Sequence, residues 1–192
     1  MSIVAPTNYN ITTILAIDPS SNCTGVAIFE VDDYTGDIVS IVADTIEVNK
    51  LVYDPDVEEL HSDKMNRLMK LEYKFHQILE EYNPQVIVIE GSFYNPTRPN
   101  AFKSLSEVIS LLHRASIEHN KNVPFITLSP KTIKNSINSL VVTDKGKDVI
   151  KDSIKLIPEI YNLVCNFIDK LDNHGIDAIA VGYAFLKNYG DK

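Results

Sequence analysis

The segment Ile14–Glu30, ILAIDPSSNCTGVAIFE, decides the fold because it holds two apolar runs separated by a sharp polar break. The first run, ILAI, predicts a buried strand and is followed at once by Asp18 and Pro19. The second run, from Gly25 to Glu30, predicts the antiparallel partner of that strand. A carboxylate at the end of a central strand indicates either a turn residue or a metal ligand.

The composition indicates a single globular domain. The chain has 192 residues, of which 44% are hydrophobic and 23% are charged, and this is enough apolar material for one core. We expect a flexible N-terminus over residues 1–12 and one domain over residues 13–189. No apolar run approaches the ~20 residues that span a bilayer, and no signal peptide opens the sequence. We therefore expect a soluble, cytoplasmic protein.

The two cysteines, Cys23 and Cys165, do not form a close pair such as C-x-x-C. We expect two buried thiols here rather than a disulfide or a pair of zinc ligands.

The charge is unevenly distributed along the chain. The net charge is −8, which by itself argues against nucleic acid as a partner. Residues 91–155, however, contain ten basic and five acidic residues, a local balance of +5. An acidic protein can thus present one basic face, although charge alone favours ordinary variation along a surface.

The hydrophobic pattern predicts three meandering strands, followed by alternating helices and strands. The predicted strands are Thr13–Ile17, Gly25–Glu30, Ile38–Val42 with an extension over Thr45–Val48, Val86–Ile89 and Pro124–Leu128. The predicted helices are Asp56–Tyr82, Ala101–Glu118, Pro130–Ile137 with Ser129 as N-cap, Lys147–Ile157 and Asn173–Tyr189.

This order predicts an α/β fold, with a mixed five-stranded sheet covered by helices on both faces. A right-handed crossover would place the fourth strand beside the first and parallel to it.

Two strands of this predicted sheet end in a carboxylate, namely Asp18 and Glu90. If the two strands are parallel neighbours, these side chains lie at the same sheet edge, on strands about 4.8 Å apart. Two carboxylates at that spacing repel each other unless a cation neutralises them. Hard oxygen ligands suit Mg²⁺ or Mn²⁺.

The segment DNHGIDAIAVGYAF, residues 172–185, adds two further candidate ligands. His174 and Asp177 are three residues apart, so they share one face at the start of a helix. Together with the two strand ends they would form a site of three carboxylates and one imidazole. Such a group can hold two metals, one that activates a water and one that stabilises the leaving oxygen of a phosphodiester.

Each of these residues also has an ordinary structural explanation. Asp18 before Pro19 is typical of a turn, Glu90 of a cap or an ion pair, and His174 and Asp177 of a solvated helix end. Their occurrence together, on elements whose order brings them to one edge, favours the metal site.

Five segments resemble the successive motif blocks of RuvC-type Holliday junction resolvases, in the ribonuclease H-like superfamily. They occur in the family's order, from Ile14 to about Phe185: ILAIDPSSNCTGVAIFE, VIVIEGSFYNP, SPKTIKNSI, KGKDVIKDSI and HGIDAIAVGYA. Two positions depart from the common pattern. Ser20 stands where many members have glycine, and His174 where many have aspartate, although some members use histidine there.

The resemblance implies a dimeric nuclease that nicks two strands of a four-way DNA junction symmetrically. Its active site would hold two Mg²⁺ ions, with Mn²⁺ as a substitute. The metal ligands would be Asp18, Glu90, His174 and Asp177.

The basic segment would then contact DNA. The resemblance implies that Lys147 lies near the scissile phosphate and that Lys134 contacts the backbone. Four further lysines are candidate phosphate contacts: Lys131, Lys145, Lys151 and Lys155. For the last two, a solvated helix face is an equally good explanation.

Two aromatic residues, Phe93 and Tyr94, follow Glu90 in a predicted loop. There they would stack on junction bases, or else fold back into the core.

A homodimer is expected because two symmetric nicks need two active sites. The candidate interface is the apolar face of residues 101–115, with Leu105, Val108, Ile109 and Leu112, although core packing explains that stripe equally well. The alternative functions are another ribonuclease H-like nuclease acting on flaps or RNA–DNA hybrids, and a non-catalytic nucleic-acid-binding module.

Overall fold

A computed structural model describes residues 10–51, 55–93, 96–97, 99–138 and 149–189. A five-stranded sheet in the order β3-β2-β1-β4-β5 forms its centre. The strands are β1 (Ile11–Asp18), β2 (Cys23–Asp32), β3 (Ile38–Glu47), β4 (Val86–Glu90) and β5 (Phe125–Leu128). β1, β2 and β3 form an antiparallel meander, whereas β4 runs parallel to β1 and β5 parallel to β4. The predicted mixed sheet, with the fourth strand beside the first, is confirmed.

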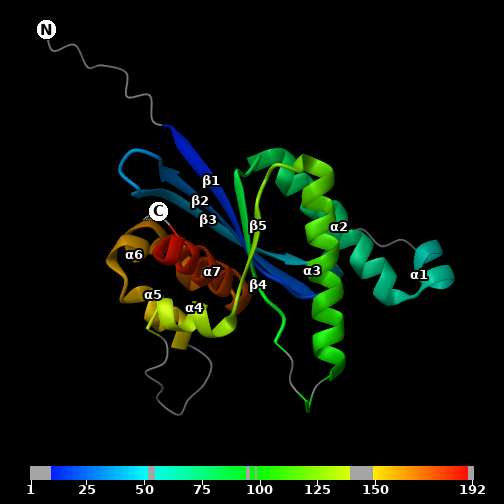
Figure 1. The fold of residues 1–192 in the computed structure, drawn as a ribbon. Helices are drawn as coiled ribbons and strands as arrows, with labels where there is room; N and C mark the ends of the chain where they lie inside the picture. The colour runs from blue at the N-terminus through cyan, green and yellow to red at the C-terminus, as the bar shows by residue number, and fades with distance from the viewer. Residues whose placement is uncertain (1–9, 52–54, 94–95, 98, 139–148, 190–192) are drawn as a thin grey trace, which may run out of the picture.

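The helices lie on both faces of this sheet (Figure 1). One face carries α2 (Asp63–Tyr82) and α3 (Pro99–Asn120), preceded by α1 (Pro55–His61). The other carries α4 (Pro130–Ser136), α5 (Val149–Lys155), α6 (Pro158–Val164) and α7 (Asn173–Tyr189). Short 3₁₀ turns, η1 (Val48–Lys50) and η2 (Ile168–Lys170), complete the elements of the described residues.

The apolar run of β1 is buried on both sides, and this is why it contains no alternating polar residue. Ile14 and Ala16 face the core under α4–α7, whereas Leu15 and Ile17 face the core under α2 and α3. Successive side chains of a strand point to opposite faces, so a strand between two helical layers must be apolar throughout. β4 follows the same rule, since Ile87, Val88 and Ile89 are all fully buried.

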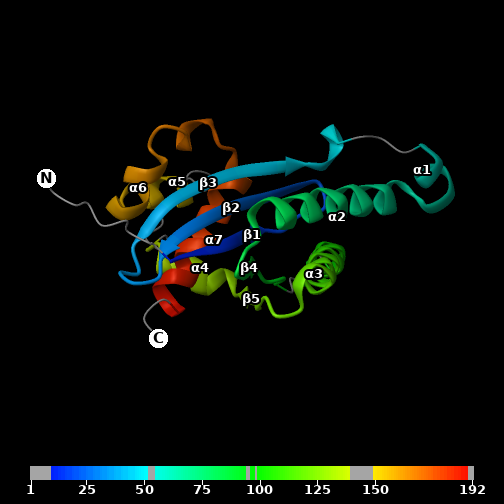
Figure 2. The ribbon, with the colours of Figure 1, turned by 90° about the horizontal axis from the view of Figure 1, so that it is seen from above.

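The stretch predicted as one helix over residues 56–82 is broken at Ser62. Ser62 has a backbone φ of 101°, and its side chain accepts a hydrogen bond from the N–H of Met65 at 3.4 Å. It therefore caps α2 and separates it from α1. Figure 2 shows α1 at the far end of α2, away from the sheet.

The apolar stripe of α3 packs into the core. Val108 and Leu112 are fully buried with Leu71 and Phe75 of α2, and Ile109 packs against the same cluster. Leu105 is half-buried. Core packing thus accounts for Val108 and Leu112, which are not available to a second subunit, whereas a dimer contact through the half-buried Leu105 and Ile109 stays a prediction.

The cysteines differ from expectation in their burial. Both are free thiols, as predicted, but Cys165 is exposed and Cys23 is only half-buried. Among the described residues, none of the helices is long and apolar enough to cross a membrane. The flexible N-terminus predicted over residues 1–12 lies almost wholly outside the described residues.

Candidate active site

Asp18 and Glu90 end two neighbouring parallel strands. The register pairs Ile17 of β1 with Ile89 of β4, so the next residue of each strand is a carboxylate at the same sheet edge. The two carboxyl groups are close enough for Asp18 to raise the pKa of Glu90. The strand order thus brings together the first two predicted site residues.

α7 brings the other two residues to this edge. Its N-terminal end lies against β1 and β4 (Figure 1). His174 Nδ1 lies 2.7 Å from Asp18 Oδ2, within hydrogen-bond distance. That hydrogen bond raises the pKa of His174, burial opposes the shift, and the charge of Asp18 adds to it.

Burial and mutual repulsion perturb two of the carboxyl groups. Burial, followed by the charges of Asp18 and Asp177 and the hydrogen bond with Asp18, raises the pKa of Glu90 to about 7. Burial and the charge of Asp18 raise the pKa of Asp177 to about 7, against the opposing effects of His174 and Lys134. Half-buried carboxylates that repel each other in this way gain stability from a cation.

The donor set fits a divalent cation. Three carboxylates supply hard oxygen ligands, and His174 adds an imidazole nitrogen; Mg²⁺ and Mn²⁺ accept oxygen ligands of this kind. Burial first, and then the charge of Asp18, raises the pKa values of both Glu90 and Asp177, as expected for partly buried acids that lie close together. The residues present therefore fit a metal, and Asp18, Glu90, His174 and Asp177 would hold it.

A second group of possible ligands lies between α2 and α3, where donor atoms of Glu72, His76 and Glu118 are within 4.8 Å of one another. The donor atoms of Asp18, Glu90, His174 and Asp177 do not form a group with such short mutual distances. Arg114 forms ion pairs with both glutamates. Because its guanidinium already compensates their charge, we assign no metal to this group.

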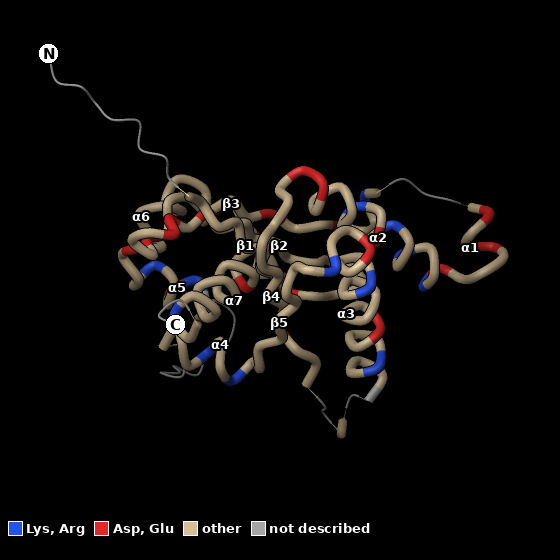
Figure 3. Tube along the Cα trace, turned by 45° about the horizontal axis from the view of Figure 1, so that its top comes forward, with Lys and Arg blue, Asp and Glu red and all other residues tan. Residues whose placement is uncertain are grey.

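Lys134 lies nearer to the carboxylates than the sequence suggested. It is on α4, where Ser129 caps the helix as predicted by accepting a hydrogen bond from the N–H of Thr132 at 3.1 Å. The positive charge of Lys134 opposes the rise in the pKa of both Glu90 and Asp177. Lys131 is exposed on the same helix, and Figure 3 shows the basic residues of α4 below the sheet. The charge of Lys134 therefore acts on the acidic centre, and Lys131 lies one turn earlier on the same helix.

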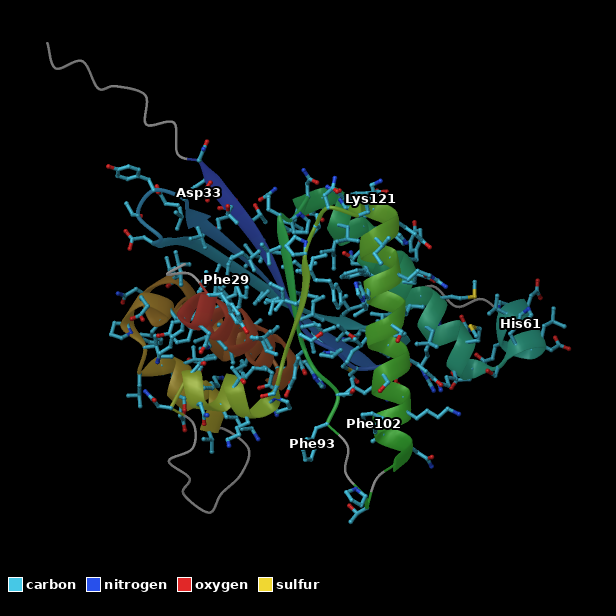
Figure 4. The ribbon with its side chains drawn as sticks, in the orientation of Figure 1. Phe29, Asp33, His61, Phe93, Phe102 and Lys121 are labelled. Carbon is cyan, nitrogen blue, oxygen red and sulfur yellow. The ribbon has the colours of Figure 1, made fainter. Side chains whose placement is uncertain are left out.

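The segment that follows β4 is exposed. The side chain of Phe93 is 71% exposed, and it points away from both helical layers (Figure 4). The alternative in which Phe93 folds back into the core is therefore excluded. Tyr94, Lys145 and Lys147 lie outside the described residues, so their roles stay predictions.

Lys151 and Lys155 have an intramolecular partner. Their ammonium groups lie 3.0 Å and 2.8 Å from the same carboxylate oxygen, Oδ1 of Asp169. These ion pairs join α5 to η2, and they favour the structural explanation for both lysines over phosphate contacts.

Comparisons with solved structures identify the fold. A structure of Thermus thermophilus RuvC in complex with a Holliday junction substrate matches with a TM-score of 0.64 and 12% identity, covering 94% of this chain and 96% of RuvC. A second structure of Thermus thermophilus RuvC gives a TM-score of 0.62 at 14% identity, with the same coverage. The yeast mitochondrial Holliday junction resolvase Ydc2 gives a TM-score of 0.61 at 14% identity, covering 93% of this chain and 79% of Ydc2.

These likenesses confirm the predicted fold, which is that of RuvC and Ydc2. At 12–14% identity they show the fold and not the activity. No protein-family model matches the sequence, and no curated protein matches it.

Proposed function

We propose that this protein is a metal-dependent endonuclease that resolves four-way DNA junctions by paired, symmetric nicks. One observation carries the proposal: Asp18 and Glu90 end adjacent parallel strands, and α7 adds His174 and Asp177 to them. The fold is shared with RuvC and Ydc2, the first of which has been solved with a Holliday junction substrate. The function itself is our inference from the site.

The four site residues would hold Mg²⁺ or Mn²⁺, with two ions in one active site. Ions bound there would polarise the scissile phosphodiester and favour ionisation of the attacking water. The raised pKa values of Glu90 and Asp177 support this assignment, because a site that resists carrying several negative charges binds cations favourably.

Lys134 would act on the substrate phosphate. An ammonium whose charge reaches the carboxylates would attract the DNA backbone to an otherwise acidic edge, and would stabilise negative charge that develops on the phosphate during attack. Lys131 would hold the backbone farther along α4. Lys145 and Lys147 extend this basic group in our proposal, with Lys147 near the scissile phosphate.

Phe93, with Tyr94 beside it, would recognise the branch point. An exposed aromatic side chain next to the candidate site is suited to stack on bases whose stacking is interrupted at the branch point of a junction. Linear duplex offers no such bases, so this contact would favour branched DNA.

A C2 dimer would provide the two active sites that symmetric nicking needs. Val108 and Leu112 would not take part in its interface, because both are fully buried in the core.

The proposal is tested by cleavage of synthetic four-way junction, flap, linear duplex and RNA–DNA hybrid, with Mg²⁺ and with EDTA. We expect Mg²⁺-dependent cleavage of the junction above all others, lost in Asp18→Asn. Preferred cleavage of flap or hybrid would replace the proposal with another ribonuclease H-like nuclease. Junction binding without cleavage would make the protein a binding module.

A further inference from the structure

Three residues form one row across the meander. The strand registers pair Asp18 of β1 with Gly25 of β2, and Gly25 with Thr45 of β3. Asp18 belongs to the candidate active site. Thr45 lies on the edge strand β3, two strands away from β1, and nothing in the sequence marks it as functional.

Each member of this row contacts the start of α7. Asp18 Oδ2 lies 2.7 Å from His174 Nδ1. A Cβ atom on Gly25 would lie 1.9 Å from the backbone oxygen of His174, so only glycine permits this approach. The hydroxyl of Thr45 donates a hydrogen bond of 2.5 Å to Oδ1 of Asp172.

Asp172 connects this row to the helix itself. The same oxygen, Oδ1, accepts a hydrogen bond of 3.0 Å from the N–H of Gly175, so Asp172 caps α7 while it binds Thr45. His174 lies in the first turn of α7, and Asp177 follows directly after that turn. A hydrogen bond from β3 to the cap residue therefore fixes where these two site residues stand relative to Asp18 and Glu90.

The core contacts of α7 hold its buried face, and the bond from Thr45 adds a contact at the exposed residue that precedes the helix. The middle of α7 packs on Phe29, whose ring occupies the place of a side chain at Gly182. That contact is two turns away from His174, so it constrains the N-terminal end of the helix less directly than a bond at that end. The bond between Thr45 and Asp172 acts at the end where the site lies.

We infer that Thr45 and Asp172 are positioning residues of the active site, which act by seating the first turn of α7 on the row Asp18–Gly25–Thr45. This inference rests on the proposed metal-dependent function of that site. Partners that orient the ligands of a metal influence its affinity by about 10–100-fold when they are removed. The bond lies at the protein surface, so its loss should change the free energy of unfolding only slightly. Its main effect should be on the positions of His174 and Asp177.

The test compares Thr45→Val with Thr45→Ser. Valine keeps the shape of threonine and suits an edge strand, so the variant should fold, but it removes the donor. Serine keeps the hydroxyl. Mn²⁺ binding is measured without DNA, from the electron paramagnetic resonance signal of free Mn²⁺. We expect binding to be about tenfold weaker in Thr45→Val and close to wild type in Thr45→Ser.

Asp172 provides a second pair of variants. Asp172→Ala removes the cap and the acceptor for Thr45, and should weaken Mn²⁺ binding as Thr45→Val does. Asp172→Asn keeps an oxygen that accepts from both Thr45 and Gly175, and should stay near wild type. Thr12→Val, at the other end of β1, is the matched control and should change nothing. Thermal unfolding of each variant verifies that the measured protein is folded.

The cleavage assay separates this inference from the proposed function. In Thr45→Val, the Mg²⁺ concentration for half-maximal junction cleavage should rise about tenfold, while the rate at saturating Mg²⁺ stays within a few-fold of wild type. Wild-type Mn²⁺ affinity in folded Thr45→Val and Asp172→Ala would overturn the inference, as would failure of the wild type to bind Mn²⁺. If the wild type binds Mn²⁺ but cuts no junction, and Thr45→Val still weakens binding, the proposed function fails and the positioning role stands.

Discussion

His174 and Asp18 are 156 residues apart in the chain, yet Nδ1 of the imidazole lies 2.7 Å from Oδ2 of the carboxylate. This contact joins the first turn of α7 to the end of β1, and it brings all four candidate ligands to one sheet edge.

The acidic residues should be essential for cleavage but not for binding. Glu90→Gln and Asp177→Asn, like Asp18→Asn, remove a ligand and leave the phosphate contacts of α4 in place. We expect loss of junction cleavage with junction affinity unchanged within a few-fold, measured by gel assays and fluorescence anisotropy. Glu80→Gln, an exposed change on α2, is the control. Near wild-type cleavage by any of the three variants would remove that residue from the site.

The metal-free protein should lose stability as the pH rises. The pKa of Glu90 is raised from 4.5, and that of Asp177 from 3.8, to about 7 in the folded state. The folded protein therefore binds more protons than the unfolded chain between these values, and the stabilisation present below pH 4 is lost as the pH rises through about 7.

Urea unfolding in EDTA at pH 5 and pH 8 measures this effect. Glu90→Gln should reduce the difference between the two pH values by about 2 kcal/mol, since each unit of pKa shift corresponds to about 1.4 kcal/mol. Mg²⁺ at pH 8 should restore stability to the wild type, because it binds only the folded state. An unchanged pH dependence in Glu90→Gln would contradict the view that burial and the charges of Asp18 and Asp177 raise the pKa of Glu90.

His174 should make cleavage sensitive to acid. Imidazole binds a metal only when it is neutral, and the contact with Asp18 raises the pKa of His174 above its usual 6.5. At subsaturating Mg²⁺, activity should therefore fall as the pH decreases through this raised value. His174→Asp should shift the profile to lower pH. Identical pH and metal profiles for the two proteins would exclude His174 as a ligand.

Lys134 and Lys131 should affect different steps. Lys134→Ala removes a cation whose charge reaches Glu90 and Asp177, so cleavage should fall about 100-fold, beyond any loss of binding. Lys131→Ala should weaken junction and duplex binding alike, and reduce the salt dependence by about one unit of slope. Binding titrations over a salt series, with single-turnover rates, separate the two. Equal effects of both variants on both measurements would contradict this division.

Phe93 should distinguish branched from linear DNA. Phe93→Ala should leave duplex affinity unchanged and weaken recognition of the junction by about 1–3 kcal/mol, the usual effect of a lost base stack. Tyr34→Ala is a control, because Tyr34 is 97% exposed on the β2–β3 turn. An equal loss of duplex and junction binding in Phe93→Ala would show that Phe93 does not read the branch point.

The sequence by itself determined the sheet and the identity of the four candidate ligands. The continuous apolar runs of β1 and β4 follow from burial on both faces, and each run stops at a carboxylate because the strand leaves the core there. The apolar runs and the spacing of His174 and Asp177 depend only on neighbouring residues, so the sequence showed them directly. The place of the fourth strand beside the first followed from the right-handed crossover rule. The amphipathic pattern of α3 was equally local, but it does not say whether its apolar face meets the core or another subunit.

Only the tertiary structure decided what depends on contacts between distant segments. It placed the α3 stripe in the core, paired Lys151 and Lys155 with Asp169, and brought Lys134 close to Glu90 and Asp177. Thr45 is the clearest case, since its hydroxyl bonds to a carboxylate 127 residues away. A threonine on an edge strand is ordinary in sequence, and its partner exists only because strand register and helix packing bring β3 and α7 together.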